Sequence, residues 1–379
     1  MARVALGSLA GAMLAGCASR NYSPLSAPPG QAPLTPAVAN PEIVVLPQES
    51  APVIGLDKLD AEPLPAPAAT NVAPPVAVPP VTFARGWIPL REWSDRCGLG
   101  APERRVSGGA TVYRVATRNG TCTLTIGSRR AFWNGITIWL GFAPQLIQGE
   151  ARIHGLDAEK TLLPLAQMPE RPRTGGRVVV LDPGHGGSDS GTPGAHHELE
   201  KTYTLDWALR TERLLTNAGW KVLLTRRADV DVSLAERVAF ADRVHADLFI
   251  SLHFNSTFPQ TQPSGIETYC LTPAGMPSTL ARGYADDERA VFPNNAFDQA
   301  NAEWAFRIHR SLLARTQAHD DGIKRARFMS VLRYQARPAI LVEGGFLSNA
   351  KEAADIQSAA YREQLATALA QAVQEKARP

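Results

Sequence analysis

The sequence predicts an α/β fold in residues 174–379, with a mostly parallel sheet and helices on both faces. One observation behind this prediction is the alternation of short apolar runs with segments whose apolar residues have helical spacing. A second is that apolar runs lead into His185, His253 and Glu343, which can bind a metal or move a proton. In open α/β sheets such groups gather outside the carboxyl ends of the strands, so we expect one shared site there.

The expected elements follow one another as strand and helix. Strands are expected at residues 177–182, 220–226, 248–254, 265–270 and 338–344, and helices at 200–218, 233–246, 298–317 and 361–376. Gly219 is a typical helix stop, and Ser233 with Glu236 forms a capping box. Because parallel strands are joined through helices, this order implies a sheet covered on both sides.

Residues 85–170 are expected to form a small β-rich domain. Short β-branched or aromatic runs are separated by turn signals, among them Asn-Gly pairs at 119–120 and 134–135. Trp133 and Trp139 stand at strand spacing, which favours core positions. Stacking on sugars is the alternative role for these two side chains.

The first 17 residues are expected to be a targeting segment. Arg3 precedes an apolar run, Val4–Leu14, which is too short to span a bilayer but fits a secretory signal. The run leads into LAGC, which resembles the cleavage box of bacterial lipoproteins and implies lipidation of Cys17. The residues after Cys17 lack the aspartate that retains lipoproteins in the inner membrane, so the periplasmic side of the outer membrane is expected. An ordinary signal or a cytosolic start are the alternatives.

Residues 18–84 are rich in proline and alanine and poor in aromatic residues. Such a segment cannot bury a core and is expected to be a disordered linker with polyproline II character. Among the three cysteines beyond it, Cys97 and Cys122 could form a disulfide in an oxidising envelope, but the sequence does not decide the pairing. Cys270 lies in an apolar strand pattern and is expected to be an inert core thiol.

The charge balance argues against a nucleic-acid partner. The chain has 39 basic and 36 acidic residues, a net charge of +3, and no long basic run. Nucleic-acid binding relies on a concentrated basic surface, which this composition does not indicate.

The chemistry expected of the site is that of a catalytic zinc ion. Two histidines and a glutamate are one of the ligand sets that leave a coordination position open. His185, His253 and Glu200, which follows His185 by fifteen residues, would be these ligands. Glu200 opens a helix, where the charged carboxylate is favoured. Glu343 ends an apolar strand and would be the general base acting on the water that zinc activates.

The order of these motifs resembles the zinc-dependent N-acetylmuramoyl-L-alanine amidases, the amidase_3 type of cell-wall hydrolase. The resemblance covers about 200 residues and is carried by the following segments: DPGHGG at 182–187, EK at 200–201, TRRAD at 225–229, LAERVAFAD at 234–242, ADLFISLHFNS at 246–256, GIETY at 265–269 and ILVEGGFLSN at 340–349. It implies zinc bound by His185, Glu200 and His253, with Glu343 as the acid/base. It also implies peptidoglycan as the substrate, cut between the muramic acid lactyl group and L-alanine.

Some features depart from this family or extend it. His197 stands where the family usually has glycine and is expected in an exposed loop, with a substrate or ligand-orienting contact as the alternative. Asn255 could orient the site through a side-chain hydrogen bond. Residues 272–295 show no convincing inhibitory helix, so regulation by an activator protein is left open.

Residues 85–170 loosely resemble the small domains that precede some cell-wall hydrolases, and those of the copper amine oxidase N-terminal type, which suggests a binding or spacing role.

Two other functions are compatible with the residues. A zinc carboxypeptidase-like enzyme acting on stem peptides uses a related ligand set and would release amino acids. A non-catalytic wall-binding lipoprotein would retain the fold but would be expected to lack Glu343 or a ligand, and the sequence lacks neither.

Overall fold

The computed structural model describes residues 82–118, 120–169, 176–192, 199–280 and 286–374. These residues belong to one compact unit, Val76–Pro379. The predicted signal segment with Cys17, the linker up to residue 81, and His197 lie outside the described residues. In the described part of the chain no helix is long and apolar enough to cross a membrane.

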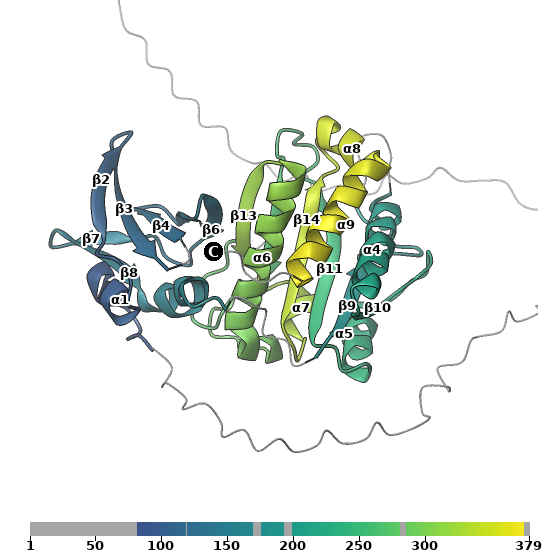
Figure 1. Cartoon of the computed structure of the whole chain (residues 1–379), viewed down its shortest axis with the longest axis horizontal. Helices are drawn as coiled ribbons and strands as arrows, with labels where there is room; N and C mark the ends of the chain where they lie inside the picture. The colour runs from purple at the N-terminus through teal and green to yellow at the C-terminus, as the bar shows by residue number, and fades with distance from the viewer. Residues whose placement is uncertain (1–81, 119, 170–175, 193–198, 281–285, 375–379) are drawn as a thin grey trace, which may run out of the picture. The chain divides into compact units, whose positions relative to one another are not determined.

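The C-terminal half is an α/β fold built on a mixed sheet (Figure 1). The strands in spatial order are β10 (Lys221–Leu224), β9 (Val178–Pro183), β11 (Leu248–Asn255), β14 (Ala339–Phe346), β12 (Ile266–Cys270) and β13 (Asp320–Arg325). Neighbours are parallel except β12 and β14, which are antiparallel. The expectation of a mostly parallel sheet therefore holds for β10, β9, β11 and β14, whereas β12 and β13 run the other way.

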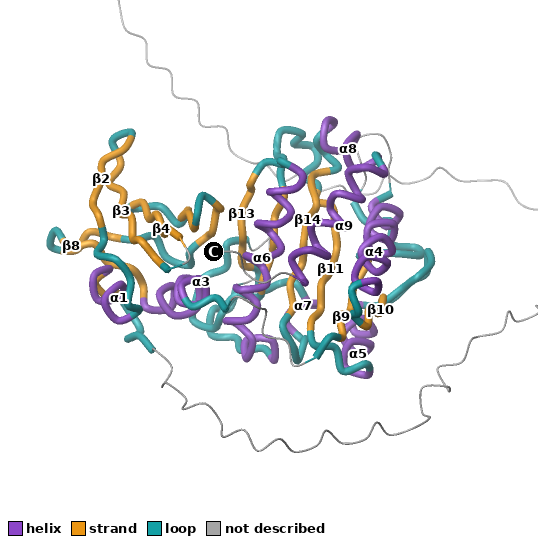
Figure 2. The backbone as a smooth tube through the Cα atoms, in the orientation of Figure 1, coloured by secondary structure: helices purple, strands orange, loops and turns teal. Residues whose placement is uncertain are grey.

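Helices cover both faces of this sheet. In β9, Val179 and Leu181 belong to one apolar core, and Val180 belongs to a second. The first core includes residues of α4 (Glu200–Asn217), α6 (Asp298–Thr316) and α9 (Ala359–Gln374), the helices that lie across the strands in Figures 1 and 2. The second includes residues of α5 (Leu234–Arg243) and α7 (Ser330–Arg333). Helix α8 (Ala350–Gln357) and the turn η3 (Pro293–Phe297) complete this half.

The N-terminal half is rich in short strands. The elements are β1 (Trp87–Pro89), α1 (Leu90–Arg96), β2 (Glu103–Ser107), β3 (Ala110–Thr117), β4 (Gly120–Thr125), β5 (Arg130–Trp133), β6 (Ile136–Trp139), β7 (Gln145–Ile147), β8 (Glu150–His154), α2 (Gly155–Asp157), η2 (Ala158–Leu162) and α3 (Leu163–Ala166). Strands β2 to β6 form an antiparallel meander, and β1, β8 and β7 form a separate sheet. Strand β6 also pairs with β13 through Ile138 and Ile323, so the meander extends the sheet of the C-terminal half.

Two local signals in the sequence are found where they were predicted, whereas Asn119 of the other predicted Asn-Gly turn lies outside the described residues. Asn134 and Gly135 have φ values of 53° and 82° and join β5 to β6, which confirms that hairpin turn. Helix α5 begins with the predicted capping box, in which Ser233 Oγ accepts from the Glu236 amide and Glu236 accepts from the Ser233 amide.

The cysteines of the described part are not paired. Cys97, Cys122 and Cys270 form no disulfide in this structure, so the pairing that the sequence allowed between the first two is absent. Cys270 is fully buried, as its apolar surroundings predicted, and burial raises the pKa of its thiol.

Candidate metal centre and catalytic carboxylate

A glycine-rich turn presents His185 at the end of β9. His185 has a φ of 61°, which directs the backbone away from the strand direction immediately after Gly184. A side chain at Gly184 would come within 2.2 Å of the His253 ring, so only glycine allows the two segments to approach this closely. The turn therefore brings the His185 imidazole to the carboxyl end of β11.

Glu200 is the first residue of α4 and is almost completely buried, with 1% of its surface exposed. Its carboxylate accepts hydrogen bonds from the backbone amides of Thr192 at 2.9 Å and Phe254 at 3.0 Å. Burial opposes ionisation, but the interactions with His185 and His253 outweigh it and hold the pKa of Glu200 well below its usual range. Glu200 is therefore a buried anion fixed between two histidines.

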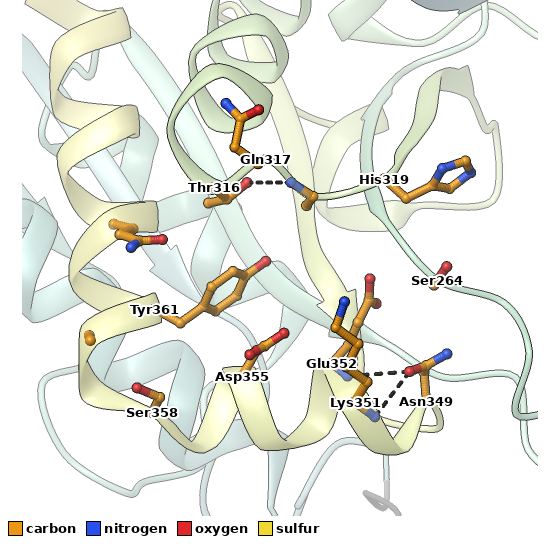
Figure 3. Close-up of a pocket in the computed structure, with 13 residues that line it drawn as sticks. Ser264, Thr316, Gln317, His319, Asn349, Lys351, Glu352, Asp355, Ser358 and Tyr361 are labelled. Carbon is orange, nitrogen blue, oxygen red and sulfur yellow. Dashed lines mark hydrogen bonds between the residues drawn. The ribbon is translucent and has the colours of Figure 1, made fainter.

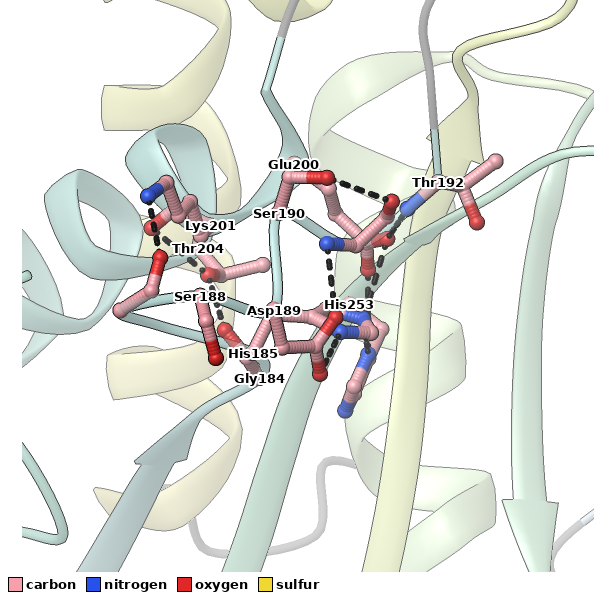
Figure 4. A network of polar contacts seen from close by, with 12 residues as sticks. Gly184, His185, Ser188, Asp189, Ser190, Thr192, Glu200, Lys201, Thr204 and His253 are labelled. Atoms are coloured by element: carbon pink, nitrogen blue, oxygen red, sulfur yellow. Dashed lines mark hydrogen bonds and ion pairs between the residues drawn. The ribbon is translucent and has the colours of Figure 1, made fainter. Parts of the chain in front are cut away.

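The three side chains converge, as Figure 4 shows. His185 Nε2 lies 3.1 Å from Glu200 Oε2, His253 Nδ1 lies 3.0 Å from Glu200 Oε1, and the two ring nitrogens lie 3.2 Å apart. Potential ligand atoms of His185, Glu200 and His253 all lie within 4.8 Å of one another. The structure thus brings together the three residues that the sequence analysis selected as metal ligands.

The outer nitrogen of each imidazole is occupied by another partner. His185 Nδ1 lies 2.8 Å from Asp189 Oδ2. His253 Nε2 lies 3.1 Å from Ser251 Oγ, whose hydroxyl donates to Asp182 Oδ2 at 2.7 Å. If each outer nitrogen carries the proton, both inner nitrogens present lone pairs to the Glu200 carboxylate.

This arrangement fits a divalent cation. Neutral imidazoles and a carboxylate that face one another are all hydrogen-bond acceptors, and a cation between them satisfies all three. Two imidazoles and one carboxylate match the zinc set that keeps a position open for water or substrate. The donor set of His185, Glu200 and His253 is therefore compatible with zinc.

Glu343 lies on the strand next to His253. The parallel pairing of β11 and β14 places the two residues opposite each other, so their side chains share one face of the sheet. Glu343 is 7% exposed, which makes it a largely buried carboxylate beside the histidines. A cavity of about 460 Å³ opens at this end of the sheet, and His185, Asp189, Arg237 and His253 are among its lining residues.

Asn255 lies two residues beyond His253 and is 5% exposed. Its side-chain nitrogen donates to Glu267, and its side-chain oxygen accepts from the Ser256 amide at 2.7 Å. Glu267 lies opposite Glu343 in the antiparallel pairing of β12 and β14. The structure therefore connects Asn255 to the carboxylate that neighbours Glu343.

The residues that hold the histidines in place through hydrogen bonds were not predicted from the sequence. Asp182, at the end of β9, accepts from Ser251 and also from Arg237 at 2.5 Å. The signal that could have found Ser251 is its place as a polar residue inside the apolar run of β11. Asp189 had no comparable signal because it lies in an exposed loop.

Another polar cavity, of about 420 Å³, lies around α8 and contains none of the three converging residues (Figure 3). Its central carboxylate, Glu352, accepts from the backbone amides of Gly265 and Phe346, both at 2.7 Å. Burial raises the pKa of Glu352. Because these bonds fasten the end of β14 and the turn before β12 to α8, we assign Glu352 a structural role.

The residues of this centre lie in a region of the chain that matches a known protein family. The family described as N-acetylmuramoyl-L-alanine amidase (Amidase_3) matches residues 179–375, which include all four candidate site residues. This chain belongs to the N-acetylmuramoyl-L-alanine amidase family. The converging histidines and Glu200 of this amidase-family chain, together with Glu343, all lie within the shared region.

The related proteins carry the same family name. The chain is 32% identical over 238 residues to the N-acetylmuramoyl-L-alanine amidase AmiC of Escherichia coli O6:H1, a match that covers 56% of each chain. It is 30% identical to AmiA of Escherichia coli K12, covering 54% of this chain and 78% of AmiA. The solved structure of AmiC2 of Nostoc punctiforme is 32% identical and covers 53% of this chain and 97% of that one, with a TM-score of 0.44. The amidase-family chain thus spans about half the length of AmiC.

Proposed function

We propose that the chain hydrolyses the amide between the lactyl group of N-acetylmuramic acid and the L-alanine of the peptidoglycan stem peptide. The observation that carries this proposal is the convergence of His185, Glu200 and His253 beside Glu343, in a chain of the amidase family. The family supplies the identity of the bond, and the geometry supplies the groups that hydrolysis requires.

His185, Glu200 and His253 would hold a zinc ion. When bound, zinc supplies a Lewis acid that polarises the amide carbonyl and lowers the pKa of water. The protein holds the two imidazoles in place through Asp189 and Ser251, and the backbone amides of Thr192 and Phe254 hold the Glu200 carboxylate between them.

Glu343 would move the proton. Its carboxylate would accept a proton from the attacking water as the oxygen bonds to the carbonyl carbon. It would then return this proton to the alanine nitrogen as the carbon–nitrogen bond breaks, so that an acid and an amine leave. Its low exposure, 7%, and its place opposite His253 in the pairing of β11 and β14 support this role.

Glu343→Gln retains the size of the side chain but cannot accept the proton. We expect digestion of purified peptidoglycan to slow by about 10²–10⁴-fold, while the zinc content of the protein is unchanged. Mass spectrometry of the products would measure both the rate and the bond cut. Wild-type digestion rates in the variant would refute the role of Glu343.

The same digestion separates the proposed reaction from its alternatives. The proposed bond cleavage yields intact stem peptides and glycan chains whose N-acetylmuramic acid residues carry a free lactyl carboxyl group. A carboxypeptidase-like reaction would instead release free amino acids from the stem. If the zinc-loaded wild-type protein released neither product, a non-catalytic wall-binding role would replace the proposal.

We also propose that the chain acts in the cell envelope, anchored by a lipid on Cys17 to the periplasmic side of the outer membrane. The resemblance of the LAGC box to lipoprotein signals supports this placement. A peptidoglycan substrate requires an envelope location and is compatible with such an anchor.

A further inference from the structure

A third cavity, called the hollow below, lies on the same face of the sheet as Glu343. His253, Glu343 and Glu267 stand opposite one another across β11, β14 and β12, so their side chains form a row. The hollow has a volume of about 340 Å³ and begins at the Glu267 end of this row. It is lined by Trp139, Asn255, Thr257, Pro263, Glu267, Tyr269, Thr279, Leu280, Asp321, Lys324 and Phe346.

One wall of the hollow is Trp139, the last residue of β6. Ile138 pairs with Ile323, so Trp139 lies next to Lys324 of β13. The indole Nε1 donates to the Asp321 carbonyl at 3.4 Å. Gly322 has a φ of +94°, and a side chain there would come within 2.9 Å of the indole. The glycine therefore allows the Trp139 ring to lie against the backbone of β13 as a fixed surface.

Trp139 differs in exposure from Trp133, which is the last residue of the neighbouring strand β5. Trp133 is fully buried and belongs to the apolar core. Trp139 is partly exposed and lines the hollow. Trp133 is therefore a core residue, whereas Trp139 presents an aromatic surface that a ligand can reach.

The polar groups of the hollow carry an excess of negative charge. Lys324 Nζ contacts the carboxylates of both Glu267 and Asp321, the second at 2.9 Å. One ammonium between two carboxylates leaves a net negative charge, and Glu343 adds another nearby. Anionic ligands are disfavoured in such a field, whereas a neutral ligand with hydroxyl and amide groups can hydrogen-bond to these side chains.

We propose that this hollow binds a neutral N-acetylated sugar ring of the glycan strand, with one face of the ring stacked on Trp139. The proposal rests on the proposed function, because a bound glycan would hold the muramoyl amide near Glu343. The volume lies within the range of small-ligand sites, and an apolar wall with a few polar groups is typical of them. The stem peptide, which carries carboxylates, fits this charge pattern less well.

The test uses the tetramer of N-acetylglucosamine, a probe that has no muramoyl amide and so is not a substrate for the proposed reaction. Calorimetric titration of the full-length, zinc-loaded protein should detect binding. Loss of an aromatic contact of about 1 kcal/mol predicts at least about fivefold weaker binding in Trp139→Ala. Trp139→Phe should retain most of the affinity, and Tyr334→Ala, at an exposed aromatic residue outside the hollow, should retain all of it.

Trp139→Leu tests whether weaker binding results from the loss of the aromatic ring or from a disrupted fold. Leucine retains an apolar side chain against β13 but has no aromatic face, so we expect a thermal midpoint near that of the wild type and binding as weak as in Trp139→Ala. Equal affinity of Trp139→Leu and wild type would overturn the proposal. Absence of tetramer binding by the wild type, or displacement of the tetramer by free stem peptide, would overturn it as well.

Peptidoglycan digestion by the same preparations separates this proposal from the proposed function. If the wild type releases stem peptides but fails the tetramer test, the sugar site is refuted and the amidase reaction stands. If the wild type binds the tetramer but releases no stem peptide, the amidase reaction is refuted, and the hollow has no role in it.

Discussion

The hydrogen-bond partners of the outer imidazole nitrogens determine which nitrogens of His185 and His253 face Glu200. Ser251 donates to Asp182, so its oxygen is oriented to accept from His253 Nε2 and to leave Nδ1 facing Glu200 as the candidate ligand atom. We predict that Ser251→Ala weakens zinc binding by roughly 10–100-fold, because His253 loses the partner that fixes its tautomer. Competition with a chelator of known affinity would measure the change, and Ser251→Thr should restore most of it.

Thr225→Val is the matched control for this effect. Thr225 also donates to Asp182, at 2.6 Å, but the described contacts do not include one between it and either histidine. Its loss should leave zinc affinity within about threefold of the wild type. Zinc affinity that is equal in Ser251→Ala and wild type would show that Ser251 does not orient His253.

The ligands themselves were predictable from the sequence, whereas their supports were not. His185 follows β9, Glu200 begins α4, and His253 and Glu343 lie in the C-terminal halves of β11 and β14. The carboxyl ends of parallel strands meet at one edge of the sheet. The support of Ser251 depends on the register between β11 and β9, in which Ser251 lies opposite Asp182. Register is set by the packing of whole strands and cannot be read from one strand alone.

Among the elements, the pattern of apolar residues located most strands of the C-terminal half but did not give their direction. Strand β12 has the same apolar character whether it runs parallel or antiparallel to β14. Strand β13 was not predicted because Asp320, Asp321, Lys324 and Arg325 make it polar. Pairing with β12 and β6 stabilises it, and Ile323 is its buried apolar side chain.

Helix α2 is fastened to the end of β6 by one buried carboxylate. Asp157 accepts from the backbone amides of Gly141 and Phe142, both at 2.8 Å, and from Thr161 at 3.1 Å. Burial nevertheless raises its pKa from 3.8 to about 6. The folded chain thus binds this proton more tightly than the unfolded chain, so the associated stability is present below the unfolded pKa and is lost as the pH rises through about 6.

Asp157→Asn, which resembles the protonated carboxyl, should remove this pH dependence. Between about pH 4 and about pH 7 we expect the wild type to lose roughly 3 kcal/mol of unfolding free energy relative to the variant. Urea unfolding of both proteins at several pH values would measure the difference. Parallel stability curves for the two proteins would contradict a raised pKa at Asp157.

In the sequence a long proline-rich segment precedes the part of the chain that the structure describes, which begins at residue 82. If Cys17 carries a lipid, this segment would connect the membrane surface to the peptidoglycan layer, and the proposed hydrolase would be confined near its proposed substrate. Acyl chains contribute about 0.8 kcal/mol of membrane affinity per buried methylene group, so removing the attachment site should release the protein.

We therefore predict that Cys17→Ala moves the protein from the membrane fraction to the soluble fraction, while digestion of purified peptidoglycan by the isolated variant is unchanged. Cys97→Ala, at a cysteine inside the folded unit, should remain with the membranes. Fractionation of cells followed by immunodetection would measure both. If Cys17→Ala stays with the membranes as the wild type does, the anchor is elsewhere, whereas reduced digestion by the purified variant would mean that the N-terminal segment affects catalysis directly.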